Sequence, residues 1–397
     1  MRIGIDACCW TNRRGFGRFT RELLTAMLAL EDAHDYVFFV DAHTAGQCTF
    51  PARADVVIAE VGQAPVAAAS AQSRRTLRDL WAMSRAVLSR EIDLFFFPAV
   101  YTYFPVLNAG TRIVVTVHDL IADRFPALTF ENRTRSLLWR WKEGVARGQA
   151  DRLLTVSEHS RRRILERFRL PPGRVAVVTE AAAPRFRPLP DGPDRHAALW
   201  RHGLDPGRRF LLHVGGFSPH KNLLALLSVF ARLAGRPTNA DVDLALVGDL
   251  ENDAFHTHVP ALRCRVEELG IQPRVRFTGF VPDGDLVHLY GAAAAVVLPS
   301  FEEGFGLPAV EAMACGAAVA ASRAGSLPEV VGDAGLFFDP HQPDEILRAL
   351  TVVLGDEGVR NELRTRSLAR ARDYAWPTAA RQALAVFAEV AQAGSDP

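Results

Sequence analysis

The chain has 397 residues, of which 49% are hydrophobic and 23% charged, and its formal net charge is +1. This length suits two domains of ordinary size, and this balance excludes a disordered or fibrous protein. The sequence shows neither a signal peptide nor a run of about 18 apolar residues that would span a membrane. The five cysteines follow no metal-binding spacing, so we expect a cytoplasmic protein.

The first half of the chain alternates short apolar segments with helical patterns. The predicted strands cover Arg2–Asp6, Tyr36–Val40, Asp55–Ala59, Ile92–Phe97, Arg112–Val117, Arg152–Ser157 and Val175–Val178. The predicted helices cover Arg18–Leu30, Arg75–Ser89, Glu131–Gly148 and Glu158–Phe168. Strands that alternate with helices predict a parallel sheet covered by helices on both faces.

A proline-rich stretch, Ala183–Pro193, interrupts this pattern, and we place the domain linker there. The second half then repeats the alternation. Its predicted strands cover Phe210–Val214, Asp243–Val247, Arg274–Thr278, Ala294–Leu298, Ala317–Ala321 and Gly335–Phe338. Its predicted helices cover Lys221–Ala234, Ala261–Leu269, Gly284–Ala292, Gly306–Ala314, Pro343–Leu354, Asp356–Tyr374 and Pro377–Gln392.

The fold class is therefore α/β, with two Rossmann-like, doubly wound domains at residues 1–187 and 188–375. In such sheets ligands collect at the carboxyl ends of the strands, so we expect both domains to line a cleft.

The basic residues are unevenly placed and unusual in type. Residues 1–187 carry 27 basic and 19 acidic side chains, whereas the remaining residues carry 19 and 26. This asymmetry indicates an anionic partner for the first half, either a membrane surface or a phosphate-bearing acceptor. The sequence offers no nucleic-acid motif, so nucleic acid is not expected. Only Lys142 and Lys221 are lysines, which singles out Lys221 as a position where a compact ammonium is needed.

The passage Pro299–Gly316 combines several features of a ligand site. Gly304 and Gly306 follow a predicted buried strand and let the backbone approach a ligand, and the next helix offers free N–H groups to an anion. Glu303 precedes that helix, and Glu311 lies on it eight positions later, on roughly the same face. Two carboxylates at this spacing can hold sugar hydroxyls at two points of one ligand.

This passage closely resembles the signature of the retaining glycosyltransferases with the GT-B fold, in the family numbered four. The resemblance implies that Glu303 contacts the donor sugar and that Glu311 binds the ribose hydroxyls. It also implies that the backbone from Gly304 through Phe305, Gly306 and Leu307 approaches the sugar and the diphosphate. In this family a C-terminal helix, here residues 376–397, crosses back to the first domain.

The segment Leu212–Asn222 resembles the phosphate-binding turn of the same family. Gly215 and Gly216 form the turn, and Lys221 would supply a positive charge to the diphosphate. The family has an arginine where this chain has Gly216, so His220 or an arginine of the first domain would replace that contact. The alternative for Lys221 is an ordinary lysine at a helix start.

Two elements of the first domain complete the resemblance. Gly15 and Gly17 open a helix and resemble the glycine-rich loop that faces the diphosphate and the acceptor, although a simple hinge also fits them. His118 ends a predicted strand and resembles the family histidine near the donor sugar, with a structural histidine as the alternative. We assign catalytic roles to His118, Lys221 and Glu303.

No metal and no other cofactor are expected. Phe280 lies in a stretch that resembles the segment whose backbone reads the nucleobase. Two Asp-x-Asp triplets, Asp241–Asp243 and Asp283–Asp285, would bind a metal in another glycosyltransferase fold, but here one leads into a strand and the other begins a helix. Lys221, arginines and helix N-termini would neutralise the diphosphate instead.

Two further features of the first half bear on the acceptor. One helical pattern carries Arg74, Arg75, Arg78 and Arg85, and a second carries Arg133, Arg135, Arg140, Lys142 and Arg147 with Trp139 and Trp141. Basic helices with tryptophan can lie on anionic membranes, although an ordinary solvated surface also fits. Tyr101, Tyr103 and Phe104 would form either an acceptor platform or part of the core.

The resemblance implies a retaining, metal-independent hexosyltransferase. Its donor would be a nucleotide diphosphate sugar carrying mannose or a rhamnose-like hexose, with GDP as the expected carrier. Its acceptor would be a glycan or a lipid-linked sugar in surface polysaccharide biosynthesis, at the inner face of the membrane. The alternatives are a GT-B nucleotide-sugar epimerase and a non-catalytic subunit that binds nucleotide sugars.

Overall fold

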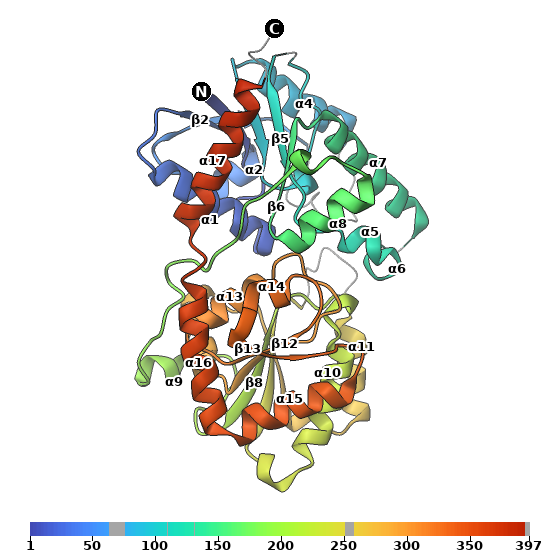
Figure 1. Ribbon diagram of the computed structural model, residues 1–397, viewed down its shortest axis with the longest axis vertical. Coiled ribbons are helices and arrows are strands. Elements are labelled where there is room, and N and C mark those ends of the chain that lie inside the picture. The colour runs from blue at the N-terminus through green and yellow to red at the C-terminus, as the bar shows by residue number, and fades with distance from the viewer. Residues whose placement is uncertain (63–75, 109, 131, 251–257, 394–397) are drawn as a thin grey trace. The chain divides into compact units, whose positions relative to one another are not determined.

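The computed structural model describes residues 1–62, 76–108, 110–130, 132–250 and 258–393. By its internal contacts the chain divides into two units (Figure 1). The first unit comprises Met1–Glu180 and Trp376–Pro397, and the second comprises Ala181–Ala375. None of the described helices is both long and apolar enough to cross a membrane.

The first unit is built on a parallel sheet whose seven described strands lie in the order β3-β2-β1-β4-β5-β6-β7. These strands are β1 (Arg2–Asp6), β2 (Asp35–Asp41), β3 (Ala54–Ala59), β4 (Leu94–Phe97), β5 (Arg112–Thr116), β6 (Arg152–Thr155) and β7 (Val175–Val177). The central strands β1, β2, β4, β5 and β6 are rich in valine, leucine, isoleucine and phenylalanine and are mostly buried, as parallel strands between two helical layers must be, whereas the edge strand β3 leaves Ile58 55% exposed.

Helices cover both faces of this sheet. One face carries α1 (Gly15–Ala29) and α17 (Trp376–Gln392), which pack against each other (Figure 1). The other carries α4 (Leu77–Leu88), α7 (Arg133–Gln149) and α8 (Glu158–Phe168), which share one hydrophobic core. The remaining described helices are short: α2 (Ala42–Gln47), η1 (Val100–Thr102), α5 (Ile121–Arg124), α6 (Pro126–Thr129) and η2 (Pro172–Arg174).

The second unit contains a parallel sheet whose six described strands lie in the order β10-β9-β8-β11-β12-β13. These strands are β8 (Arg209–Val214), β9 (Val242–Val247), β10 (Val275–Gly279), β11 (Ala295–Leu298), β12 (Val319–Ser322) and β13 (Gly335–Phe338). The longer helices around them are α9 (Pro193–Arg201), α10 (Leu223–Ala234), α11 (Val259–Glu268), α12 (Asp283–Ala292), α13 (Leu307–Ala314), α15 (Pro343–Gly355) and α16 (Glu357–Ala371). Shorter elements are η3 (Pro219–Lys221), η4 (Pro237–Asn239), η5 (Gln272–Arg274), α14 (Leu327–Val331) and η6 (Gly332–Ala334).

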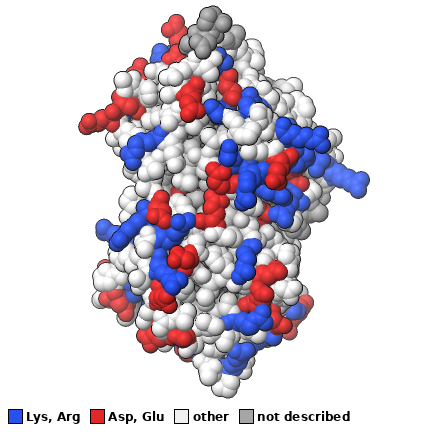
Figure 2. Space-filling view, viewed as in Figure 1, with Lys and Arg blue, Asp and Glu red and all other residues white. Residues whose placement is uncertain are grey.

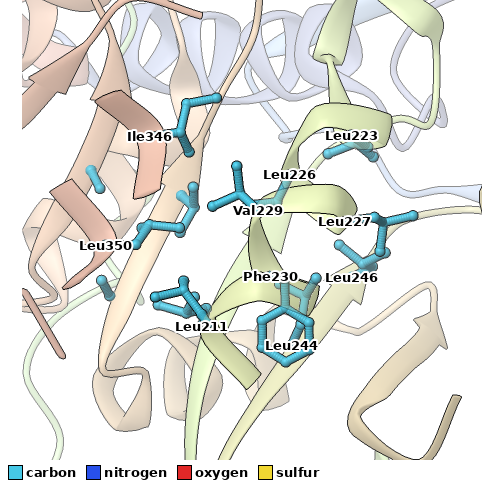
Figure 3. Packing of buried hydrophobic residues seen from close by; sticks show 14 of the residues in the cluster. Leu211, Leu223, Leu226, Leu227, Val229, Phe230, Leu244, Leu246, Ile346 and Leu350 are labelled. Carbon is cyan, nitrogen blue, oxygen red and sulfur yellow. The ribbon is translucent and has the colours of Figure 1, made fainter. Parts of the chain in front are cut away.

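The core of the second unit joins its sheet to the helices of one face. Figure 3 shows Leu226 and Phe230 of α10 beside Leu211 and Leu244 of the sheet, with Leu350 of α15 next to them. Burying a side chain of this size stabilises the fold by about 1.5–3 kcal/mol. The core therefore fixes the positions at which the strands end and the loops that follow them begin.

The predicted fold class, two Rossmann-like α/β domains, is confirmed. The predicted domain boundary after residue 187 is wrong, because the first unit ends at Glu180. The linker residues Arg185 and Phe186 belong to the second unit, where Arg185 pairs with Asp283 and Phe186 packs on Tyr290.

Three predicted elements differ in detail. The proline-rich linker is followed at once by α9, which begins with Pro193 in the first turn, where proline is tolerated. Helix α1 begins at Gly15 rather than Arg18. Lys221 does not start an α-helix, since it ends η3 and the left-handed Asn222 separates it from α10. Arg74, Arg75, Glu131 and residues 394–397, which belong to predicted helices, lie outside the described residues.

Candidate active site

The loop between β11 and α13, residues 299–306, is the centre of the candidate site. Ser326 Oγ donates to the carbonyl oxygens of Glu303 (3.1 Å) and Phe305 (2.8 Å), which holds the loop in one conformation. Gly306 has a φ of +93°, and a Cβ atom there would lie 2.7 Å from Cδ2 of Leu327. Both the backbone conformation and the space require glycine at the start of α13. No side chain caps this helix; in its first turn Pro308 has no N–H and the Ala309 N–H donates to the carbonyl oxygen of Gly306 at 2.8 Å, which leaves the N–H of Leu307 for an anion.

Lys221 and Glu303 meet at this loop. Lys221 Nζ lies 2.7 Å from Oε1 and 2.9 Å from Oε2 of Glu303, and Ser300 Oγ donates to Oε1 at 2.6 Å. Glu303 is buried and Lys221 nearly so. Burial raises the pKa of Glu303, but the charge of Lys221, the nearby His220 and the hydrogen bonds from Lys221 and Ser300 together outweigh it, and the pKa lies below its ordinary value. The glutamate is therefore an anion whose charge is matched by one ammonium group.

Two histidines adjoin this ion pair and stay neutral. His213 lies on β8 with Nδ1 3.0 Å from the carbonyl oxygen of Val297, so Nδ1 carries the hydrogen. Burial, with a smaller effect of the Lys221 charge, lowers the pKa of His213 to about 4 and that of His220 to about 3. The backbone N–H of Phe301 donates to the carbonyl oxygen of His220 at 2.8 Å, which ties η3 to the loop.

Glu311 is buried on α13 and held by a second residue. Tyr290 of α12 donates its hydroxyl to Glu311 Oε2 at 3.0 Å, and the tyrosine itself is fully buried. The structure thus places Glu303 in the loop before α13 (Leu307–Ala314) and Glu311 on that helix, as the sequence predicts.

The glycine turn after β8 also belongs to this region. A Cβ atom on Gly215 would lie 3.9 Å from Cε of Lys221, so the turn runs beside the lysine. Gly216 is exposed and offers no side chain where the family has an arginine. Phe280 follows β10 and is 43% exposed. The roles of Gly215, Gly216 and Phe280 in binding a donor stay predictions.

The glycine-rich segment of the first unit is held by main-chain contacts. Arg21 Nη1 donates to the carbonyl oxygens of Trp10 and Asn12, both at 2.6 Å. A Cβ atom on Gly17 would lie 2.2 Å from the carbonyl oxygen of Asn12, whereas one on Gly15 would have no atom within 4 Å. Gly17 is therefore required by packing alone, and Gly15 is the position open to a ligand.

His118 is enclosed by groups of the first unit. Its Nε2 lies 2.9 Å from the carbonyl oxygen of Pro98, and its Nδ1 lies 3.5 Å from Oε1 of the buried Glu180. The edge of Phe19 packs on the ring. These contacts are those of a structural histidine, the alternative that the sequence left open, and a contact with the donor sugar stays a prediction.

The aromatic residues after β4 have two different roles. Tyr103 and Phe104 are buried in the core, so their part in an acceptor platform is not supported. Tyr101 lies between Phe16 and Trp139, with ring centroids 4.8 Å and 5.2 Å away. Ser157 caps α8, since its hydroxyl oxygen accepts from the backbone N–H of Ser160 at 3.0 Å.

The aspartates of the two Asp-x-Asp triplets are all in ion pairs with basic residues. Asp241 binds Arg209, and Asp243 binds both Arg208 and Arg274. Asp285 binds Arg201, and Asp283 lies 3.6 Å from Arg185. These carboxylates are thus engaged in ion pairs within the second unit.

The sequence reading missed the residues that position the charged groups. Ser300 contacts Glu303, and Ser326 contacts the backbone of the loop. Tyr290 contacts Glu311, and His213 contacts the carbonyl oxygen of Val297. A polar residue in a strongly apolar stretch was the available signal for His213 and Tyr290. The two serines carry no such signal, because serine is common in loops.

Comparison with known proteins agrees with this geometry. Residues 194–372 match the family described as Glycosyl transferases group 1, and residues 13–181 match Glycosyltransferase Family 4. The chain is 33% identical over 278 residues to the O-antigen chain mannosyltransferase B of Escherichia coli, covering 70% of each protein. It is 29% identical over 296 residues to the serotype-specific mannosyltransferase WbdA of Escherichia coli, covering 74% of this chain but only 35% of WbdA.

The fold has close counterparts among solved structures. The sucrose-phosphate synthase of Thermosynechococcus elongatus superimposes with a TM-score of 0.76 at 19% identity, covering 99% of this chain and 100% of the other. The fold is thus that of the GT-B glycosyltransferases, and the chain belongs to glycosyltransferase family four, the group 1 glycosyltransferases.

Proposed function

We propose that this glycosyltransferase is a retaining, metal-independent hexosyltransferase that uses a nucleotide diphosphate sugar. The observation that carries the proposal is the buried pair of Lys221 and Glu303 at the uncapped start of α13. An ammonium group and helix N–H groups suit a diphosphate, and a carboxylate suits sugar hydroxyls.

Each charged group has a separate task in this proposal. Lys221 and the N-terminus of α13 stabilise the negative charge that develops on the leaving diphosphate, so neither a metal nor another cofactor is needed. Glu303 accepts hydrogen bonds from the sugar, and Glu311 accepts them from the ribose. When the donor binds, the ammonium group of Lys221 gives up part of its hydrogen bonding to Glu303 and binds the phosphate. Glu303 keeps its hydrogen bond from Ser300 and gains sugar hydroxyls as partners.

The reaction that we propose replaces one bond at the anomeric carbon. An acceptor hydroxyl oxygen bonds to that carbon while its bond to the phosphate oxygen breaks, and the nucleoside diphosphate leaves. The hydroxyl proton goes to the departing phosphate, and the new bond forms on the face that the phosphate occupied. His118 and the segment from Gly15 to Gly17 are assigned to the sugar and diphosphate on family resemblance, and the first unit is assigned the acceptor.

Mannose or a rhamnose-like hexose is the proposed sugar, carried by GDP. The support is the likeness to two mannosyltransferases of Escherichia coli, one named for the O-antigen chain. The acceptor would accordingly be a glycan or a lipid-linked sugar of a surface polysaccharide, and the site of action the inner face of the membrane.

Thermal unfolding with GDP, UDP, ADP and TDP, each with and without EDTA, tests the donor site. A ligand that binds only the folded state raises the melting temperature. We expect a rise with GDP that EDTA leaves unchanged and that Lys221→Ala removes. No shift with any nucleotide would contradict the site, and a shift abolished by EDTA would contradict metal independence.

Product analysis separates the remaining alternatives. With GDP-mannose and a mannose-terminated acceptor, we expect GDP release and a product whose anomeric configuration, measured by NMR, matches the donor. An altered nucleotide sugar formed without acceptor would identify an epimerase. Tight binding without turnover would identify a non-catalytic subunit. This alternative is considered because Gly216 stands where the family has an arginine.

A further inference from the structure

His213 has one ring nitrogen without a hydrogen-bond partner. The side chain lies on β8 and is fully buried, and its Nδ1 donates to the carbonyl oxygen of Val297 at 3.0 Å. Its Nε2 is buried too and has no partner among the described residues. Because Nδ1 carries the hydrogen, Nε2 presents a bare lone pair. An unpaired polar atom inside a protein costs free energy, so Nε2 is expected to gain a partner when the site is filled.

Nε2 faces an open space at the glycine turn after β8. A Cβ atom on Gly215 would lie 3.4 Å from Nε2 of His213 and 3.9 Å from Cε of Lys221. These are ordinary van der Waals distances, so the side of Gly215 that carries no side chain has room for one more atom. The function proposed above assigns the donor diphosphate to this turn. A phosphate oxygen that enters the space comes within reach of both the imidazole and the lysine.

The charges around this space cancel before a ligand arrives. The ammonium group of Lys221 lies 2.7 Å from Oε1 of Glu303, so the two groups together carry no net charge. His213 and His220 are neutral, since their pKa values are about 4 and about 3. The chain after residue 187 has more acidic than basic side chains, and Figure 2 shows basic side chains of the second unit next to acidic ones. The diphosphate, a multiply charged anion, therefore needs a further positive charge at this turn.

We propose that His213 takes up a proton on Nε2 when the donor diphosphate binds at the Gly215 turn, and that the imidazolium then donates a hydrogen bond to a phosphate oxygen. The proton comes from the solvent, and the lone pair of Nε2 forms the new N–H bond, so no other bond changes. The phosphate oxygens of a nucleotide sugar only accept hydrogen bonds, so a neutral Nε2 would repel them whereas a protonated one binds them. The inference rests on the function proposed above, because it needs the diphosphate at this turn.

The groups around His213 favour this change of charge. Burial keeps its pKa at about 4 in the free protein, against the hydrogen bond to Val297, which raises the pKa. Among the charged groups, Lys221 of η3 lowers the pKa and Glu303 of the loop before α13 raises it. An anion within about 4–6 Å favours the charged form of a histidine, and it also offsets the charge of Lys221. Between about pH 4 and the raised pKa, the complex therefore binds more protons than the free protein.

Isothermal titration calorimetry with GDP-mannose, without acceptor, tests the proposal. If the thermal test above selects another base, a sugar nucleotide of that base, such as UDP-glucose, replaces it. A nucleotide sugar is the right probe because it lacks a terminal phosphate group, which itself titrates at about pH 6. The binding heats in two buffers of different ionisation enthalpy give the number of protons taken up. We expect this number to approach one at about pH 5, and Kd to fall by up to about tenfold for each unit that the pH falls.

Two histidine variants locate the proton. His213→Asn keeps an amide N–H for the carbonyl oxygen of Val297 but does not titrate, so both the proton uptake and the pH dependence of Kd should be lost. His220→Asn changes the other neutral histidine beside Lys221 and should keep both. The melting temperature shows that each variant is folded.

Nitrogen NMR of the wild type, labelled in its histidines, tests the same step without a variant. In the free protein His213 should have a protonated Nδ1 and a bare Nε2, and GDP-mannose should convert the bare nitrogen to a protonated one. A spectrum in which no ring nitrogen changes its protonation would overturn the inference.

The remaining outcomes separate this inference from the function on which it rests. Binding without proton uptake would mean that Nε2 stays neutral, which overturns the inference and leaves the donor site intact. Uptake that persists in folded His213→Asn would place the proton on Glu303 or His220 and overturn it as well. If no nucleotide sugar binds, the proposed donor site is wrong, and the inference falls with it.

Discussion

The two units present their candidate residues in different ways. In the second unit, Lys221 and Glu303 are 82 positions apart and lie side by side with opposite charges. In the first unit, His118 and Gly17 contact atoms of their own unit: a carbonyl oxygen and a carboxylate around the histidine, and the backbone of Asn12 against the glycine. In the second unit, a ligand can insert between Lys221 and Glu303 and bind both charges. In the first unit, His118 and Gly17 are already enclosed by atoms of that unit.

This difference indicates which residues contribute to ligand binding and which contribute to the stability of the fold. A buried ion pair contributes little to stability, because desolvation offsets the attraction between the charges, so its presence calls for a ligand that uses it. A glycine packed on a carbonyl oxygen, in contrast, is explained by packing alone. Loss of either charge of the Lys221–Glu303 pair should therefore act on turnover, and filling the space at Gly17 should act on stability.

The strongest test of this comparison removes either charge of the pair. Lys221→Ala or Glu303→Ala should lower kcat/KM by about 100-fold or more, since each removes a group that stabilises developing charge or holds the sugar. The double variant should lose little more than the worse single one, because residues that act as a unit are not additive. Steady-state kinetics with circular dichroism on the same samples provides the measurement.

A second ion pair of the same unit serves as the matched control. Arg232 Nη1 and Asp344 Oδ1 are also 2.7 Å apart, but both side chains are exposed. Arg232→Ala should leave kcat/KM unchanged and shift stability by less than about 1 kcal/mol. Wild-type activity in a folded Lys221→Ala or Glu303→Ala variant would remove the basis of the proposed donor site.

The histidines beside the pair sharpen the comparison through pH. His213 has a pKa of about 4 in the folded protein, whereas its pKa in the unfolded chain is near 6.5. The unfolded state therefore binds more protons between these values, so the contribution to stability is complete above pH 6.5 and is lost as the pH falls towards 4. From about pH 7 to pH 5 the loss from this one group is about 2 kcal/mol.

His213→Phe should accordingly be less stable than the wild type at neutral pH and less sensitive to acid. The urea midpoint of each protein at neutral and mildly acidic pH measures both effects. His220 titrates in the same direction, so part of the pH dependence should remain in the variant. The half-exposed His196 is the control, and an unchanged pH dependence in His213→Phe would show that His213 is not held neutral.

Much of the fold was legible in the sequence because its determinants are local. The runs Phe210–Val214 and Ala294–Leu298 predict strands by composition alone, and the structure places β8 and β11 there. The helix that carries Glu311 was likewise predicted from its own residues and is α13, although Glu303 lies in the loop before it. Both features follow from backbone geometry within a few residues.

What the sequence did not yield depends on contacts between distant segments. Nothing in the residues around Lys221 shows that its partner is Glu303, since the strand order brings β8 beside β11. The end of the first unit at Glu180 was also missed, because proline marks a break in regular structure and not the unit to which the next residues belong. Phe186 joins the second unit by packing on Tyr290, a contact across 104 positions of the chain.

The glycines of the first unit offer a test of intermediate size. Gly17→Ala places a Cβ atom against the carbonyl oxygen of Asn12 and should destabilise the first unit by about 1–3 kcal/mol. Gly15→Ala meets no atom within 4 Å and should change stability by less than about 1 kcal/mol. Calorimetric melting of the two variants provides a matched comparison, and equal melting temperatures would contradict the packing role of Gly17.

The smallest effect is expected at Tyr290, which positions Glu311. Tyr290→Phe keeps the ring that packs on Phe186 and removes the hydroxyl that donates to Glu311 Oε2. One hydrogen bond to a charged group contributes about 1.5–3 kcal/mol, much of it recovered when Glu311 binds ribose hydroxyls instead. We therefore expect KM for the donor to rise several-fold with kcat nearly unchanged.

A donor that lacks the ribose 2′-hydroxyl separates a role in binding from a role in folding, because it removes one partner of Glu311 from the ligand. If Tyr290 acts through Glu311, the KM difference between the natural and the 2′-deoxy donor should shrink in Tyr290→Phe. A difference equal to that of the wild type would mean that Tyr290 stabilises α12 and α13 without shaping the ribose site.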